Sequence, residues 1–103
     1  MQTSNDNMLD WFFLTATNDV RLSSTHLSLY FVLYRYWLKN DHKNPIAITR
    51  KEVMRYAKIK GLATYTKCMH ELNDYGYITY LPSYNPATGS TVYLHRIHRL
   101  KRL

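Results

Sequence analysis

Residues that cross-link or interrupt a chain are scarce in this sequence. Its 103 residues include one cysteine, Cys68, three glycines and three prolines. A single cysteine excludes a disulfide within the chain, so we expect a reducing, cytoplasmic environment and interpret Cys68 as a small buried apolar residue. With so little glycine and proline, no low-complexity linker divides the chain. We therefore expect residues 1–103 to form one domain.

Long apolar runs and catalytic motifs are lacking as well. No segment reaches the ~18 apolar residues of a membrane-spanning helix, and the first residues are acidic and polar, unlike those of a secretory signal. The sequence has no glycine-rich phosphate loop, no nucleophile elbow and no recognisable pair of catalytic carboxylates. We expect a protein that is not an enzyme and that binds no membrane, no cofactor and no small molecule.

The spacing of possible metal ligands gives only a weak signal. His95 and His98 lie three residues apart, but no cysteine or carboxylate accompanies them at ligand spacing. The other histidines are His26, His42 and His70. We expect no metal site and interpret the five histidines as surface groups.

What the sequence does contain is a pair of helix signals in its second half. Thr49 and Glu52 have the spacing of a capping box, which predicts a helix that begins just after Thr49. A second helix is expected over residues 62–75. It should end at Gly76, because glycine readily adopts the left-handed conformation that terminates helices.

Strand signals follow the second helix. Residues 77–80 and 91–94 are rich in aromatic and β-branched side chains and flank a turn-rich segment at 82–89. A short apolar segment at 45–48 is expected to form an edge strand that pairs with this hairpin. Two helices followed by a hairpin are the layout of a winged helix-turn-helix.

The N-terminal part predicts two further helices. Apolar residues recur at three- and four-residue spacing over 7–16 and 24–39. Ser23 is placed as the N-cap of the later helix, with Leu22 and Leu27 as a hydrophobic staple. We interpret the apolar stripes of both helices as core. The residues expected to face inward are Leu9, Phe12, Phe13 and Ala16 in the first helix and Leu27, Tyr30, Phe31, Tyr34, Trp37 and Leu38 in the second.

The expected fold class is therefore α+β and mainly α. It is a winged helix-turn-helix with an extra N-terminal helix and a two- or three-stranded wing sheet. Its parts are an N-terminal helix and connector over 1–22, a winged-helix core over 23–94 and a basic C-terminal tail over 95–103.

Positive charge outweighs negative charge and is unevenly distributed. The chain has 14 lysines and arginines against 7 aspartates and glutamates. Residues 1–20 carry three acidic and no basic side chains, whereas 21–58 carry eight basic and two acidic ones, and 59–103 carry six and two. The positive charge thus lies on and around the predicted motif, as binding to phosphates requires.

The candidate DNA-binding surface is the outer face of helix 62–75 together with the wing at 82–90. In a helix-turn-helix, the early residues of the second helix reach base edges in the major groove. The basic tail can add phosphate contacts. The candidate residues are Lys60, Ala63, Thr64, Thr66, Lys67 and His70 at the second helix, Arg50, Lys51, Ser83, Tyr84, Asn85 and Ser90 at the first helix and wing, and Arg96, Arg99, Lys101 and Arg102 in the tail.

Several stretches of the chain carry a family resemblance. They are residues 21–23 leading into 29–30, then 44–46, Arg50 with Met54, 63–67, 76–86 and 89–90. On these stretches the chain resembles small winged-helix proteins encoded on bacterial mobile elements and genomic islands, which are described as helix-turn-helix regulators. It is more loosely similar to the N-terminal domains of phage replisome organisers and plasmid replication initiators. The resemblance implies DNA binding in a bacterial cytoplasm and points to Thr64, Thr66 and Lys67 and to the wing at 83–90.

Two functions are consistent with these observations. The first is binding to double-stranded DNA as a transcriptional regulator. We expect it to act as a homodimer through the N-terminal helix, because DNA sites are commonly two-fold. The alternative is a protein-interaction or assembly module of a replication or transfer complex that uses the same winged helix. It is favoured by the lack of Arg, Asn and Gln at the start of helix 62–75 and by the acidic residues Glu71 and Asp74.

Overall fold

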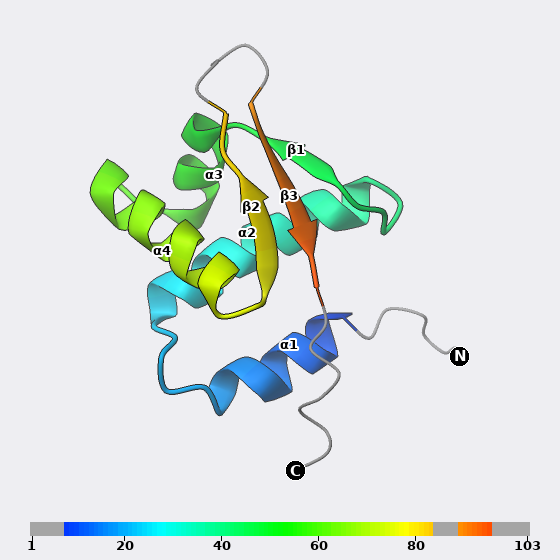
Figure 1. Cartoon of the computed structure of the whole chain (residues 1–103), viewed down its shortest axis with the longest axis vertical. Coiled ribbons are helices and arrows are strands. Elements are labelled where there is room, and N and C mark those ends of the chain that lie inside the picture. Colours follow the sequence, from blue (N-terminus) through cyan, green and yellow to red (C-terminus); the bar gives the residue numbers. More distant parts are fainter. Residues whose placement is uncertain (1–7, 84–88, 96–103) are drawn as a thin grey trace.

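The computed structural model describes residues 8–83 and 89–95, which form four helices and three strands (Figure 1). The mainly helical α+β class expected from the sequence is confirmed. None of the described helices is long and apolar enough to cross a membrane. The elements are α1 (Met8–Thr17), α2 (Ser24–Lys39), β1 (Ile46–Ile48), α3 (Arg50–Ala57), α4 (Leu62–Asp74), β2 (Ile78–Leu81) and β3 (Ser90–Leu94).

The strands form one antiparallel sheet with β3 in the centre, between β1 and β2. Ile46 of β1 and Tyr80 of β2 both lie opposite Val92 of β3. The side chain of Asn44 extends the pairing beyond β1, since its amide donates to the carbonyl oxygen of Leu94 and accepts from the N–H of the same residue, each at 3.0 Å. The prediction that the segment at 45–48 pairs with the hairpin is confirmed.

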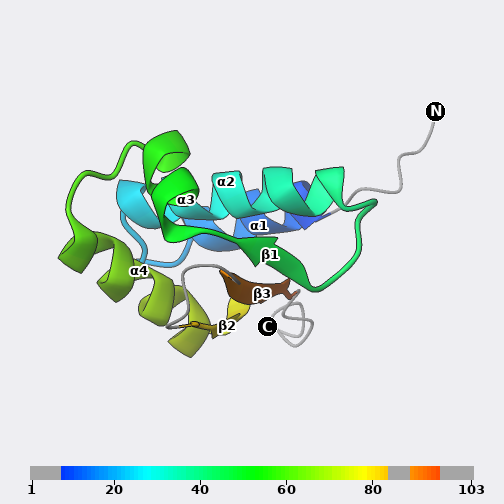
Figure 2. The same ribbon diagram turned by 90° about the horizontal axis from the view of Figure 1, so that it is seen from above.

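The core lies between the sheet and α2, with α1, α3 and α4 packed around it (Figure 2). Phe12 of α1 stacks on Tyr30 of α2 with ring centroids 3.7 Å apart. Alternation along β3 buries Val92 and Leu94, and the helical spacing of α4 buries one side of that helix. Gly76 has a φ of 92° after the end of α4, as expected of a glycine that terminates a helix.

Four apolar residues expected in the core are exposed instead. Phe13 and Phe31 are 62% and 61% exposed, and Leu9 and Leu27 are each 37% exposed. The prediction that these four residues face inward was wrong. Helix α1 meets α2 through the side of the helix that carries Phe12, and no described element covers the side that carries the exposed residues.

The predicted capping box at Thr49 forms only in part. The Thr49 hydroxyl oxygen accepts the N–H of Glu52 at 3.4 Å, as expected. The Glu52 carboxylate, however, accepts a hydrogen bond of 2.9 Å from the Tyr36 hydroxyl of α2. Burial and this hydrogen bond raise the pKa of Tyr36 to about 12. Glu52 therefore joins α3 to α2 rather than completing the cap.

Candidate nucleic-acid interface

Helix α4 presents the residues predicted for it on one exposed face. Its buried side is formed by Tyr65, Cys68, Met69 and Leu72. The exposed candidates are Lys60 just before the helix and Ala63, Thr64, Thr66, Lys67 and His70 within it. These six residues therefore form a surface that a partner can reach.

Lys67 is the charged residue at the middle of this surface. Its Nζ lies 3.1 Å from Oε2 of Glu71, one turn further along α4, and its side chain is 71% exposed. The hydrogen bond to Glu71 raises the pKa of Lys67, so the ammonium group stays charged. An exposed pair of this kind is weak.

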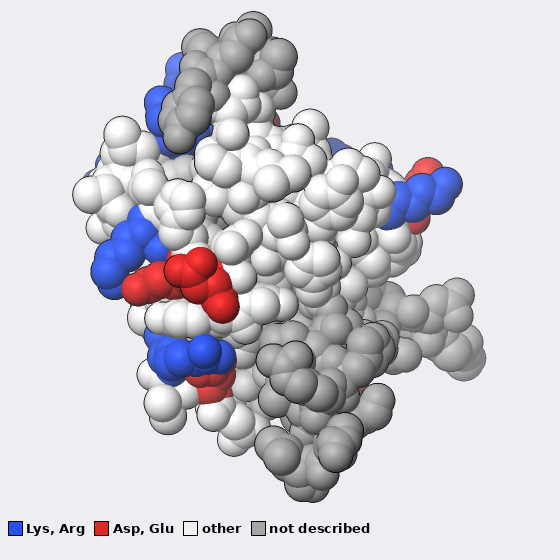
Figure 3. Space-filling model, in the orientation of Figure 1, with Lys and Arg blue, Asp and Glu red and all other residues white. Residues whose placement is uncertain are grey.

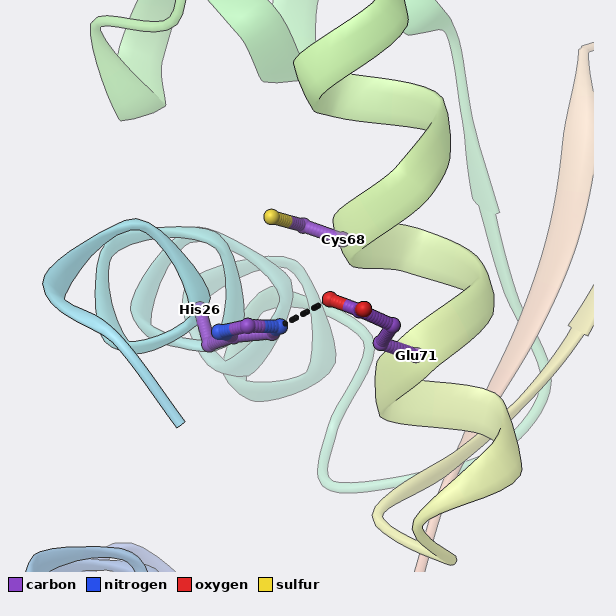
Figure 4. A group of neighbouring side chains, drawn as sticks. All are labelled: His26, Cys68 and Glu71. Carbon is purple, nitrogen blue, oxygen red and sulfur yellow. Dashed lines mark hydrogen bonds and ion pairs between the residues drawn. The ribbon is translucent and has the colours of Figure 1, made fainter. Parts of the chain in front are cut away.

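Glu71 points from α4 toward α2 (Figure 4). Its Oε1 lies 2.8 Å from Nε2 of the His26 imidazole. Hydrogen bonds from His26 and then Lys67 lower the pKa of Glu71. The carboxylate therefore has one oxygen directed at the body of the domain and the other paired with Lys67.

His26 is buried, with a side chain only 5% exposed, so its interpretation as a surface group was wrong. Its Nδ1 lies 2.8 Å from the backbone nitrogen of Ser23 and accepts that N–H at the start of α2. An Nδ1 that accepts a hydrogen bond carries no proton, so Nε2 carries the ring proton and donates a hydrogen bond to the Glu71 carboxylate. His26 thus takes the place that glutamate or glutamine has in the usual capping box, which is why the sequence pattern did not reveal it.

Cys68 completes a group of three possible metal ligands with His26 and Glu71. Their ligand atoms lie within 4.8 Å of one another, and all three side chains project into the space between α2 and α4 (Figure 4). However, burial raises the pKa of the Cys68 thiol, which favours its protonated form. His26 already uses both ring nitrogens in hydrogen bonds. The donor set therefore fits a structural contact between two helices better than a metal centre.

The hairpin is held at a fixed place beside α4. The N–H of Tyr80 in β2 donates to the side-chain oxygen of Asn73 at 2.8 Å. The ring of His70 meets the ring of Tyr80 edge-on, with centroids 5.3 Å apart. His70 is thus oriented by the hairpin, although it stays exposed.

Helix α3 brings two further candidates, Arg50 and Lys51, to the surface in its first turn. Burial raises the pKa of Tyr65 in α4, and the positive charge of Arg50 opposes that rise. Both Arg50 and Lys51 are exposed, as the candidate DNA-binding surface requires.

The predicted wing residues are described only at the base of the hairpin. There the N–H of Ser83 donates to the hydroxyl oxygen of Ser90 at 3.2 Å, so these two candidates pair with each other. The other wing and tail candidates lie outside the described residues. They are Tyr84, Asn85, Arg96, Arg99, Lys101 and Arg102.

Positive charge is concentrated in the helix pair and its connection. Between residues 50 and 67 there are six basic side chains and one acidic side chain, Glu52. In Figure 3 basic and acidic groups lie next to one another at the edge over α4, whereas the face over the sheet is largely uncharged. The basic residues are Arg50, Lys51, Arg55, Lys58, Lys60 and Lys67.

The N-terminus of α4 directly follows two of these cations, Lys58 and Lys60. Its N-cap, Gly61, has no side chain that could accept a hydrogen bond from the first turn. The first N–H groups of a helix lack partners within the helix and carry partial positive charge. A phosphate is therefore well suited to this end of α4. Sequence reasoning missed this feature, although a glycine directly before a predicted helix could have indicated it.

Comparisons of the chain with models of known protein families, with curated proteins and with solved structures found no match.

Proposed function

We propose that the chain binds double-stranded DNA as a winged helix-turn-helix protein and acts as a transcriptional regulator. In this proposal α3 and α4 are the helix pair, α4 enters the major groove and the β2–β3 hairpin is the wing. The observation that carries the proposal is the exposed outer face of α4, whose uncapped N-terminus directly follows two cations of the connection at 58–61, Lys58 and Lys60.

The mode of binding follows from the side chains on this surface. Lys60 and Lys67 are suited to phosphates or guanine edges, and the hydroxyl of Thr64 or Thr66 can donate to or accept from a base. The surface has few side chains that make two hydrogen bonds to one base. We therefore expect moderate sequence specificity, with a large contribution from phosphate contacts and DNA shape.

The proposal is tested by fluorescence anisotropy with a pool of random duplex DNA and two lysine variants. Lys67→Ala should weaken binding to all sequences if Lys67 contacts phosphate, and should relax one base position if it contacts guanine. Lys39→Ala is the matched control, because Lys39 ends α2 at the far side of the sheet from α4 (Figure 1). Equal affinities for the two variants and the wild type would remove α4 from the interface.

A protein-interaction module of a replication or transfer complex is the second candidate. It is favoured by Leu62, which is 49% exposed in the first turn of α4, beside the exposed Ala63. An apolar residue at this position suits a protein partner better than a phosphate backbone. If the chain has this function, its affinity for the protein partner depends on Leu62 and changes little with salt concentration. A Leu62→Ser variant with unchanged DNA affinity would be consistent with the DNA-binding proposal.

A further inference from the structure

Four exposed apolar residues of α1 and α2 line one groove, and their surface is here called the α1–α2 face. Its members are Leu9 and Phe13 of α1 and Leu27 and Phe31 of α2, which line a groove of about 630 Å³ between the two helices. Figure 2 shows the sheet on one side of α2, and none of the strands that the structure describes covers the other side. The groove is therefore open to a partner.

The other side of α1 holds the helix on the domain. Phe12 stacks on Tyr30 and meets the edge of the Tyr77 ring at 5.6 Å, Trp11 lies 5.8 Å from the same Tyr77 ring, and Ala16 is buried. Phe13 and Phe31 lie on the outer side of this contact and are each more than half exposed. Two large aromatic side chains in one exposed patch indicate an interaction surface rather than scattered surface residues.

The charges at the two edges of the face are complementary. Asp10 lines the groove on the α1 side. Arg35 stands one turn beyond Phe31 on the α2 side, in the adjoining groove that also includes Phe31. Both side chains are exposed, and neither has an ion-pair or hydrogen-bond partner among residues 8–83 and 89–95. One edge is thus acidic and the other basic.

We propose that the α1–α2 face is the interface of a homodimer of this chain. In a two-fold interface each contact occurs twice, with the roles of the copies exchanged. A two-fold axis parallel to the groove sets α1 of one copy over α2 of the other. This arrangement places each Asp10 edge opposite an Arg35 edge and buries the four apolar side chains of both copies together.

The area of the α1–α2 face sets the expected affinity of the two copies for each other. The two aromatic rings expose roughly 200–300 Å² per copy, from the usual area of such side chains. With the leucines and a polar rim, the total is at the low end of specific interfaces, about 1,200 Å². We therefore expect a dimer with a dissociation constant on the order of 1–100 µM. The interface leaves α4 free, because α4 packs on the core side of α2.

The test is sedimentation equilibrium of the full chain, without DNA, from about 1 to 500 µM. The wild-type mass should rise from 12.3 kDa toward twice that value. Asp10→Lys or Arg35→Glu alone should weaken the dimer about 10-fold or more, and the double variant should return to within about 3-fold of wild type. Lys43→Glu, a charge reversal in the exposed loop before β1, is the matched control and should leave the mass unchanged from wild type.

A wild-type mass of 12.3 kDa at every concentration would overturn the dimer, and so would a dimer that is insensitive to both charge reversals and to Phe31→Ser. Each substituted side chain is exposed, so loss of the fold is not expected, and circular dichroism checks it. Because DNA is absent from the experiment, its result is independent of the proposed function. If the chain is a monomer and still binds DNA, the proposed dimer is rejected and the proposed function is not.

Discussion

At the scale of single residues, the contacts that fix the connection between α1 and α2 centre on Asp19. Its carboxylate accepts hydrogen bonds from the Arg21 side chain at 2.7 and 2.9 Å and from the Tyr77 hydroxyl at 2.8 Å. Arg21 also lies over the ring of Tyr75, 4.1 Å from its centroid. The sequence predicts only a connector here, because the two aromatic partners lie more than fifty residues away.

Asp19→Asn should lower the free energy of unfolding at neutral pH and reduce its dependence on pH. The hydrogen bonds from Arg21, the largest effect, hold the pKa of Asp19 well below its usual range. The folded pKa is lower than the unfolded value of about 3.9, so the stabilisation is present above that value and is lost as the pH falls toward the folded pKa.

Urea unfolding at pH 7 and pH 3 measures this effect. The difference between wild type and Asp19→Asn should be smaller at pH 3. Asp41→Asn, in the exposed loop after α2, serves as the control and should keep the pH dependence of the wild type. A variant as stable as wild type at both pH values would show that the Asp19 contacts contribute nothing.

Gly89 is a second position where one residue determines the backbone. It has a φ of 70°, and a Cβ placed on it would lie 2.5 Å from the carbonyl oxygen of Ile48. Gly89→Ala should therefore destabilise the domain by at least about 1 kcal/mol, from the left-handed conformation alone. Gly61→Asn, at a glycine with a φ of −91°, should change stability by less than about 0.5 kcal/mol. Thermal unfolding compares the two, and a Gly89→Ala variant as stable as wild type would contradict the geometry.

At the scale of elements, caps and periodicity predict where helices and strands begin and end. The helix expected over 62–75 is observed as Leu62–Asp74, and the hairpin strands agree within one residue. These signals are local and act within a few residues, so the sequence carries them directly. The faces of α1 and α2 were predicted less well, because periodicity shows that a stripe is apolar but not which stripe finds a neighbour.

The candidate interface, like the helix faces, was predictable from the sequence only in part. Helical spacing places Thr64, Thr66 and Lys67 on the outer face of α4 from the positions of the buried residues alone. The contact between His26 and Glu71 was not predictable, because it joins residues 45 apart in the sequence. The orientation of Glu71 depends on this contact, and the contact exists only because α4 packs against α2.

The N-terminus of α4 offers a test of DNA binding at the scale of one element. Gly61→Asp adds a carboxylate where a phosphate is proposed, and it should weaken DNA binding by charge repulsion while the helix stays capped. Gly61→Asn adds a neutral cap of nearly the same shape and should bind DNA more tightly than Gly61→Asp. Anisotropy with one duplex compares them, and equal affinities would place the phosphate elsewhere.

At the scale of the whole molecule, two surfaces have separate properties. The outer face of α4 is polar and carries Lys67, with Lys60 just before the helix, whereas the α1–α2 face is apolar with Asp10 at one edge and Arg35 at the other. The first suits a negatively charged polymer and the second suits another copy of the chain. A dimer would present two α4 helices, as two-fold DNA sites require.

The most direct test of DNA binding is the affinity of the wild-type chain for duplex DNA at 50 and 200 mM salt. Contacts with about six phosphates should release counterions and lower the affinity about 10³-fold over this range. Salt-sensitive binding of this size is the predicted result. No binding at 50 mM salt, or binding that changes less than about 3-fold, would contradict the account and favour a protein partner for α4.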